Sequence, residues 1–393
     1  MKYNFDLTID RKNTGSLKWN IGENEIPLWV ADMDFDTAPA IKNAILRRAE
    51  QGVFGYNVVT DEWYNAICGW WSHRHGIDIP KDALVFCTGV VPAISSAVRR
   101  LTAPNEKVII QTPVYNIFFN SVLNNGRRVV EAPLLYEKGG YRLNIDDLEK
   151  KFADKETTLM ILCNPHNPVG KIWTKEELAL IGELSEKYSV TVISDEIHCD
   201  ITTPGKKYVP YASVSEACAQ NSITCISATK AFNIAGLQCA AVYSFNKKLL
   251  ARVNRALNTD EVAEPNSFAM CATVAAFNEC EDWLDEMCAY TSENKAFVAN
   301  FIAKNIPQLK FVSSDATYLC WVDCSAFIGG KPFENAAELC KELRKTTGVI
   351  LSEGGQFGLG GDKFVRINVA CPKELLTCAL ERIKSFFDKV VLF

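Results

Sequence analysis

The chain has 393 residues, more than a typical domain of roughly 100–200, so two or three structural units are expected. A formal net charge of −5 at pH 7 argues against an overall basic surface for nucleic acid or for an anionic membrane. Hydrophobic residues make up 48% and charged residues 23%, which is ordinary for a chain that buries a large core and excludes disorder as the main state.

The chain contains fifteen cysteines, an unusually high number. No CxxC pair occurs, and the four histidines do not join cysteines at zinc-finger spacing, so no metal site is predicted. The N-terminal residues lack the apolar stretch of a signal peptide, and no run of about 18 apolar residues could span a membrane. We therefore expect free, mostly buried thiols in a cytoplasmic protein.

Short apolar runs alternate with helical patterns from about residue 83 to residue 245. Strands are predicted at residues 83–87, 107–111, 158–163, 191–194, 222–227 and 238–244. Helices are predicted at residues 91–101, at residues 175–188 after Thr174 as a cap, and at residues 247–257. This alternation is typical of an α/β fold with a largely parallel sheet covered on both faces.

The pattern changes after about residue 265. Helices are predicted at residues 266–278, 283–303, 336–346 and 373–387, and short strands at residues 317–322 and 363–369. These elements indicate a smaller α+β domain, against which the first 45 or so residues are expected to pack. The expected division is a large α/β domain at residues 46–285 and a small domain at residues 1–45 and 286–393. Near the start, Trp63, Ile67, Trp70 and Trp71 have helical spacing and are expected in the core or at a dimer contact.

Residues that follow the predicted strands are candidate site residues, because open α/β sheets bind ligands at the carboxyl ends of their strands. Residues 88–92, Thr-Gly-Val-Val-Pro, follow the first strand and begin a helix whose free N–H groups could hold a phosphate. Residues 164–170, Asn-Pro-His-Asn-Pro-Val-Gly, follow the third strand, and an Asn amide there could donate to a ligand oxygen. Asp195 follows the fourth strand, where a carboxylate could hold a protonated ring nitrogen.

Lys230 follows the fifth strand among small and apolar residues, where burial would lower its pKa and make its amine a usable nucleophile. Ser227 and Lys230 also match the S-x-x-K motif of penicillin-binding enzymes, but the partner motifs S-D-N and K-T-G are absent from the sequence. Taken singly, most of these candidates fit an ordinary turn, cap or surface residue better than a functional one. Together, a helix start, an amide, a carboxylate and a lysine describe a site for pyridoxal 5′-phosphate.

Several motifs resemble those of a known family. NPHNPVG, SDEIH and SATKAFNIAGLQ are similar to the signature of fold-type-I pyridoxal-phosphate enzymes, the aspartate-aminotransferase superfamily. WVADMDF, GYN, RHG and RIN, which begin at residues 29, 55, 74 and 366, resemble the MalY/PatB group of cystathionine β-lyases and cysteine-S-conjugate β-lyases. The resemblance runs from about residue 4 to the C-terminus. It implies a large domain with a mostly parallel seven-stranded sheet, and a smaller α+β domain.

The resemblance also implies roles for single residues. Lys230 would hold the cofactor as a Schiff base and remove the Cα proton of the substrate. Asp195 would pair with the pyridine nitrogen, Asn167 would bond the 3′-oxygen, and Tyr115 would stack on the ring. Arg366 would bind the α-carboxylate of the substrate, with which it can form a bidentate pair.

The remaining implied contacts surround these residues. The phosphate of the cofactor would be held by five residues: Gly89, Val90, Val91, Ser227 and Thr229. His198 would contact the cofactor, and Tyr115 and Asp32 would contact the substrate. Tyr56 would reach the phosphate of the neighbouring subunit, which implies a homodimer.

Two departures from the aminotransferase pattern favour a lyase. His198 stands where a tyrosine is usual, and Gln238 stands where a phosphate-binding arginine is expected. We therefore expect α,β-elimination of L-cystathionine or a related cysteine S-conjugate to pyruvate, ammonia and a thiol such as homocysteine. An aminotransferase that acts on an L-amino acid is the alternative. A regulatory role through a transcription factor is a third hypothesis, for which the sequence offers no docking tail.

Overall fold

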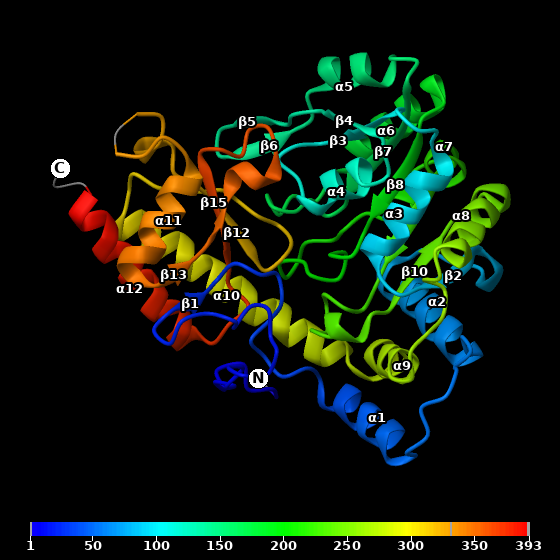
Figure 1. Ribbon diagram of the computed structural model, residues 1–393, viewed down its shortest axis with the longest axis horizontal. Helices are drawn as coiled ribbons and strands as arrows, with labels where there is room; N and C mark the ends of the chain where they lie inside the picture. The colour runs from blue at the N-terminus through cyan, green and yellow to red at the C-terminus, as the bar shows by residue number, and fades with distance from the viewer. Residues whose placement is uncertain (1, 331, 391–393) are drawn as a thin grey trace.

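The computed structural model describes residues 2–330 and 332–390 (Figure 1). Its main feature is a seven-stranded sheet in the order β2-β10-β9-β8-β7-β3-β4. The strands are β2 (Leu84–Cys87), β3 (Lys107–Ile110), β4 (Arg128–Glu131), β7 (Thr157–Cys163), β8 (Thr191–Asp195), β9 (Ser222–Ile226) and β10 (Ala240–Tyr243). Only β10 runs antiparallel to its neighbours, so the expected mostly parallel α/β sheet is confirmed.

Helices cover both faces of this sheet, because alternate side chains of its strands are apolar on each side. One face packs against α3 (Val90–Leu101), α4 (Ile117–Leu123) and α8 (Lys247–Thr259). The other face packs against α2 (Asp61–His75), α5 (Ile145–Phe152), α6 (Lys175–Tyr188) and α9 (Ala269–Glu279). The short helix α7 (Glu216–Gln220) lies beside α6, and α1 (Pro39–Glu50) lies beside α9.

A second, four-stranded sheet lies beside the first in Figure 1. Its strands, all antiparallel, are β11 (Lys310–Phe311), β12 (Leu319–Asp323), β15 (Phe364–Asn368) and β14 (Ser352–Glu353). The helices around it are α10 (Glu281–Asn305), α11 (Ala336–Thr347) and α12 (Lys373–Val390). Two small pairs complete the strands: β1 (Ile26–Pro27) with β13 (Val349–Ile350), and β5 (Leu135–Glu137) with β6 (Gly140–Arg142).

The pairing of β1 with β13 joins residues 26–27 of the N-terminal segment to the C-terminal part of the chain. The proposed domain boundary after residue 285 falls within α10, and the division into domains stays a prediction. β4 was not predicted, because this edge strand is only half-buried along its length and reads Arg-Val-Val-Glu. The tryptophan-rich stretch is confirmed as core: Trp63 and Trp71 of α2 are fully buried.

All fifteen cysteines lie in the described part of the chain and are free, and most are buried. Burial raises the pKa of several of these thiols, among them Cys87 and Cys320, which disfavours the reactive thiolate. The buried thiols are therefore unreactive core residues, whereas Cys378 is exposed. Among the described helices, none has the length and apolar character needed to cross a membrane.

Candidate active site

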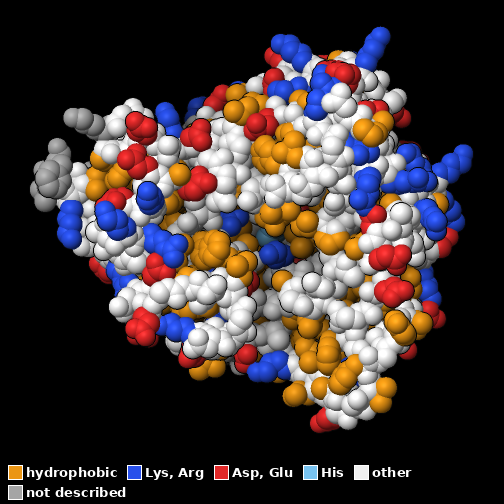
Figure 2. All heavy atoms as spheres, in the orientation of Figure 1, with side chains coloured by type: hydrophobic (Ala, Val, Ile, Leu, Met, Phe, Trp, Pro, Cys, Tyr) orange, Lys and Arg blue, Asp and Glu red, His pale blue; other side chains and the backbone are white. Residues whose placement is uncertain are grey.

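A cavity of about 470 Å³ opens at the carboxyl ends of the large-sheet strands. Its walls come from residues that follow β2, β7, β8 and β9, and from β14 and β15 of the second sheet. The face drawn in Figure 2 is hollowed near its middle, with histidine and Lys or Arg side chains at the bottom of the hollow. This is the edge at which open α/β sheets bind ligands.

The N-terminus of α3 forms one wall of the cavity. Gly89 is the N-cap residue, and Gly89, Val90 and Val91 all line the cavity. The first amides of a helix have no partner within the helix, and the helix dipole adds positive potential at that end. Thr229 brings a hydroxyl to the same cavity. This wall is therefore suited to an anion such as a phosphate.

Asp195 is the last residue of β8, and its side chain lines the cavity at 4% exposure. Its Oδ1 accepts a hydrogen bond from the N–H of Ile197 at 3.1 Å. Burial nevertheless raises the pKa of this carboxyl to about 7, because the ionised form loses its hydration. A cationic group of a ligand would restore the ionised form, which is the role predicted for Asp195.

His198 lines the cavity three residues after Asp195. Burial, with Lys230 and Arg366 nearby, lowers the pKa of its ring to about 3, so the ring is neutral at physiological pH. Its Nδ1 has no hydrogen-bond partner among the described residues. A buried nitrogen without a partner is unfavourable, and a ligand group in the cavity could supply the missing bond.

Lys230 lies in the loop after β9 and lines the cavity. Its Nζ donates to the backbone carbonyl of Ala31 at 2.6 Å. Burial lowers the pKa of this amine to about 8, although Asp32 opposes the shift. A lysine with a lowered pKa is available as a neutral nucleophile and base.

Arg366, on β15, faces Lys230 from the other sheet and is only 6% exposed. Its Nη2 donates to the carbonyl of Trp29 at 2.9 Å, and its Nη1 donates to Oδ1 of Asn167 at 3.2 Å. The guanidinium also lies 4.8 Å from the ring centroid of Phe357. The Nε has no partner in the described parts of the chain, so this fixed, planar fork can still accept a carboxylate. Tyr115 lines the cavity beside these residues.

Three of the predicted site residues do not line the cavity. The Oγ of Ser227 donates to the carbonyl of Cys239 at 2.6 Å and contacts the hydroxyl of Thr229, which does line the cavity. Tyr56 is fully exposed on the loop between α1 and α2. Asp32 directs its carboxylate to Arg11, with Nη2 at 2.7 Å. Their predicted roles stay predictions.

Sequence reasoning missed several groups that surround the cavity. The carbonyl of Ala31 accepts from both Lys230 and the hydroxyl of Tyr318, and the Oγ of Ser352 lies 3.4 Å from Nη2 of Arg366. Backbone carbonyls carry no signal in a sequence. A signal did exist for Asn368, which follows Arg366 by two residues and so lies on the same face of β15.

Pyridoxal phosphate requires an amine for its aldehyde, a negative partner for its ring nitrogen and an anion site for its phosphate. In this cavity Lys230, Asp195 and the start of α3 meet these requirements from one side of the sheet. The orphaned Nδ1 of His198 and the raised pKa of Asp195 are further signs that the cavity is shaped for a polar, cationic ligand. On this fold, the arrangement defines the class of fold-type-I pyridoxal-phosphate-dependent enzymes.

Comparison with known proteins narrows this class. The family described as aminotransferase class I and II matches residues 23–383. Cystathionine β-lyase PatB of Bacillus subtilis (strain 168) is 39% identical over 388 residues, covering 97% of this chain and 99% of the relative. The chain therefore belongs to the class I and II aminotransferase family.

Two solved structures are similar over nearly the whole chain. The pyridoxal-phosphate-bound C–S lyase of Staphylococcus hominis has a TM-score of 0.92 and 36% identity, and the similarity covers 98% of each chain. Cystalysin of Treponema denticola, which contains pyridoxal 5′-phosphate, has a TM-score of 0.95 and 33% identity, covering 99% of this chain and 100% of that one. Of these three relatives, the B. subtilis protein is named a cystathionine β-lyase and the S. hominis protein a C–S lyase.

Proposed function

We propose that this protein is a pyridoxal-phosphate-dependent C–S β-lyase. Its reaction is α,β-elimination of L-cystathionine or a related cysteine S-conjugate, with release of pyruvate, ammonia and a thiol. The observation that supports it best is that Lys230 and Arg366, from different sheets, face the same cavity. A proton acceptor and a carboxylate receptor therefore line one cavity.

Arg366 binds the α-carboxylate of the substrate and orients its Cα toward Lys230. The carbonyl of Trp29 and the amide oxygen of Asn167 fix the guanidinium plane, so little side-chain entropy is lost when the substrate binds. Tyr115 lines the same cavity, where it would contact the substrate and the face of the cofactor ring. The substrate is thus held with its Cα–H bond directed at the amine.

Lys230 is the group that removes the Cα proton. Burial keeps its pKa near 8, so a useful fraction of the amine is neutral at physiological pH. When bound, pyridoxal phosphate supplies an electron sink for the pair released from the Cα–H bond. The Cβ–S bond then breaks, the sulfur leaves as a thiol after taking a proton, and the three-carbon remainder takes up water to give pyruvate and ammonia.

Asp195 would pair with the protonated pyridine nitrogen, and Asn167 and His198, which line the same cavity, would contact the ring substituents. Gly89, Val90, Val91 and Thr229 would hold the phosphate at the start of α3. Ser227 supports Thr229 through a 2.7 Å contact between their hydroxyl oxygens. Gln238, which also lines the cavity, adds no positive charge at the phosphate. The helix N-terminus therefore provides most of the compensation.

The proposed function is tested with a Lys230→Ala variant and a panel of S-substituted cysteines that includes L-cystathionine. We expect the wild-type protein to release pyruvate and thiol without an added keto acid, and the variant to lose about 10²–10⁴-fold in rate. Lys206→Ala is the control, because Lys206 is a surface lysine paired with Asp315. Near wild-type pyruvate release by Lys230→Ala would contradict the assignment, and strict dependence on a keto acid would favour an aminotransferase.

We further propose a homodimer as the functional unit. Several large apolar side chains in the loop between α1 and α2 are exposed, namely Val53, Phe54, Tyr56 and Val58. Figure 2 shows hydrophobic side chains gathered over α1, α9 and this loop. A patch of this kind is typical of a subunit contact, and it would bring Tyr56 to the phosphate site of the second subunit.

A further inference from the structure

Residues 29–34 form an irregular stretch, here named the 29–34 segment, that passes along the cavity. Five consecutive backbone carbonyls, those of residues 29–33, each accept a hydrogen bond from a side chain elsewhere in the chain. A segment without helix or strand partners needs such bonds wherever water is excluded. The positions of these donors therefore determine the path of the segment.

On its cavity side, the segment contacts the two groups that the proposed reaction needs. The carbonyl of Trp29 accepts from Nη2 of Arg366 at 2.9 Å. The carbonyl of Ala31 accepts from Nζ of Lys230 at 2.6 Å. One short stretch of backbone thus touches both the carboxylate receptor and the proton acceptor.

Two asparagines tie the segment to the elements that carry those groups. Asn368, two residues after Arg366 on β15, donates to the carbonyls of Val30 and Asp32 at 2.6 and 2.7 Å. Asn233, three residues after Lys230, exchanges hydrogen bonds with the N–H and carbonyl of Met33 at 3.0 and 3.1 Å. The segment therefore bridges the strand of Arg366 and the loop of Lys230.

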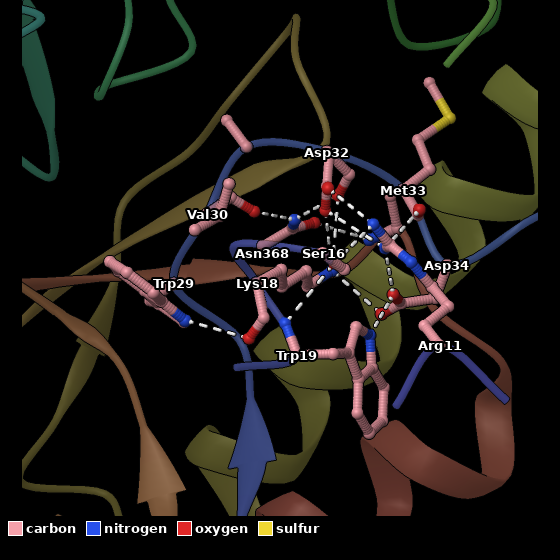
Figure 3. A network of polar contacts seen from close by, with 12 residues as sticks. Arg11, Ser16, Lys18, Trp19, Trp29, Val30, Asp32, Met33, Asp34 and Asn368 are labelled. Atoms are coloured by element: carbon pink, nitrogen blue, oxygen red, sulfur yellow. Dashed lines mark hydrogen bonds and ion pairs between the residues drawn. The ribbon is translucent and has the colours of Figure 1, made fainter. Parts of the chain in front are cut away.

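On the opposite side, Arg11 and Lys18 bind the two carboxylates of the segment (Figure 3). Nη2 of Arg11 lies 2.7 Å from Oδ2 of Asp32, and its Nη1 lies 2.7 Å from Oδ1 of Asp34. Nζ of Lys18 lies 2.8 Å from Oδ2 of Asp34 and 3.2 Å from the carbonyl of Asp32. Lys18 is 0% exposed and Asp34 is 3% exposed.

We name Arg11, Lys18, Asp32 and Asp34 the charge cluster. The two positive and two negative side chains of the cluster have no net charge. The Nε1 of Trp19 also donates a hydrogen bond to Asp34 at 2.7 Å. Removal of one partner would leave an uncompensated charge at a buried position, so the cluster admits few alternative geometries. Asp32 and Asp34 are themselves part of the 29–34 segment, and the cluster therefore fixes its backbone.

We propose that Arg11 and Lys18 are positioning residues, which set the 29–34 segment and thereby the spacing between Lys230 and Arg366. This inference rests on the proposed function, because it takes Lys230 and Arg366 as the groups that act on the substrate. It also gives Asp32 a different role from the substrate contact suggested by the resemblance. Its carboxylate acts through Arg11 and Lys18, and it is the carbonyls of the segment that meet the catalytic groups.

The test compares Arg11→Gln, Arg11→Lys and Lys18→Met with the wild-type protein. Arg11 is the first choice because its side chain is 21% exposed, so its loss leaves less buried charge than the loss of Lys18. Arg344→Gln is the matched control: Arg344 also anchors the N-terminal part of the chain, through Glu25 at 2.7 Å, but outside the segment. The readouts are hydrogen–deuterium exchange of residues 29–34, with and without cofactor, and kcat and KM for pyruvate release.

In Arg11→Gln, we expect exchange of the segment to rise about tenfold or more, since it depends on local opening. We expect kcat/KM to fall about 10–100-fold, with a raised KM and a lowered kcat, as for a small misplacement of reacting groups. Arg11→Lys should recover part of both effects, and Arg344→Gln should show neither. Lys18→Met should match Arg11→Gln if it folds.

Unchanged exchange of the segment in Arg11→Gln would overturn the inference, whatever the fate of Lys18→Met. A lower melting temperature with wild-type kcat and KM would also overturn it, because it would show a structural role alone. If the wild-type protein releases no pyruvate from any thioether, the proposed function is wrong. In that case, hydrogen–deuterium exchange without cofactor still tests the anchoring of the 29–34 segment by the charge cluster. Faster exchange in Arg11→Gln would support the anchoring, and unchanged exchange would overturn it.

Discussion

At the scale of single residues, burial controls the chemistry of the site. Burial raises the pKa of Asp195 to about 7 and lowers the pKa of Lys230 to about 8, so both pKa values lie close to physiological pH. Each shift favours the uncharged form, because the cavity offers neither group the hydration that it has in water. Perturbed titrating groups that share one cavity are typical of catalytic sites.

The raised pKa of Asp195 predicts a pH-dependent stability for the cofactor-free protein. An unfolded Asp ionises near pH 4, whereas folded Asp195 stays protonated up to about pH 7, so this group favours the folded state below pH 4. As the pH rises from about 4 to 7 this contribution is lost, and the free energy of unfolding falls by roughly 4 kcal/mol. The Asp195→Asn variant lacks this titrating group. Its free energy of unfolding, compared with that of the wild-type protein, should therefore rise as the pH rises from about 4 to 7.

Urea denaturation of both cofactor-free proteins at several pH values between 4.5 and 8 measures this difference. Titration of Lys230 falls between its folded pKa near 8 and its unfolded value near 10.5, outside most of that range. If the difference in free energy of unfolding between the wild-type protein and Asp195→Asn stays constant with pH, the expectation is contradicted. The variant should at the same time bind pyridoxal phosphate more weakly, because the ring nitrogen loses its anionic partner.

At the scale of elements, strand ends and helix caps bring the site residues to one edge. β8 ends at Asp195, α3 begins at Val90, and the loop with Lys230 follows β9. α6 has the bounds expected from the sequence, and Thr174 forms a complete capping box with Glu177. Signals of this kind are local, which is why they could be recognised without the structure.

The cap of α6 predicts a stability change without a change of activity. The N–H of Glu177 donates to Oγ1 of Thr174 at 3.2 Å, and Thr174→Ala removes that bond. We expect the free energy of unfolding to fall by about 1 kcal/mol, with kcat and KM unchanged, because Thr174 does not line the cavity. Thr60→Ala is the control: Thr60 precedes α2 but accepts no such cap bond, so a smaller loss is expected from it in the same denaturant titration.

At the scale of the whole molecule, the cavity exists only because two sheets meet. Arg366 and Ser352 come from the four-stranded sheet, whereas Asp195 ends a strand of the seven-stranded sheet and Lys230 lies in the loop after β9. In the proposed homodimer, the second subunit would complete the site in the same way. Tyr56 is fully exposed and does not line the cavity of its own chain, so it would act at the cavity of the other subunit. The apolar loop around Tyr56 is then a subunit contact.

A charge within this loop should weaken the proposed dimer. Phe54 is 55% exposed and packs on Phe268 with ring centroids 5.6 Å apart, and Phe54→Asp would place a charge at the proposed contact. We expect a monomer by analytical ultracentrifugation at micromolar concentration, with reduced pyruvate release. Leu123→Asp, at a residue 57% exposed on α4, should stay dimeric. A wild-type protein that is monomeric at these concentrations would refute the dimer.

The sequence by itself determined the parts of this protein that depend on neighbours in the chain. Alternating strands and helices, the cap at Thr174 and the residues placed after each strand gave the α/β sheet and the edge at which a ligand binds. The free state of the cysteines also followed from composition and spacing, and it is confirmed. These features rest on periodicity and turn chemistry, which act over a few residues.

The tertiary structure decided what depends on residues far apart in sequence. The bond from Arg366 to the carbonyl of Trp29 spans 337 positions, and the pair of Arg11 with Asp32 spans 21. No local pattern indicates which backbone carbonyl a side chain will reach, or that a carboxylate expected at the substrate is held by an arginine and a lysine. Such contacts exist only after the two sheets have packed, because their geometry is set by the whole fold rather than by any one segment.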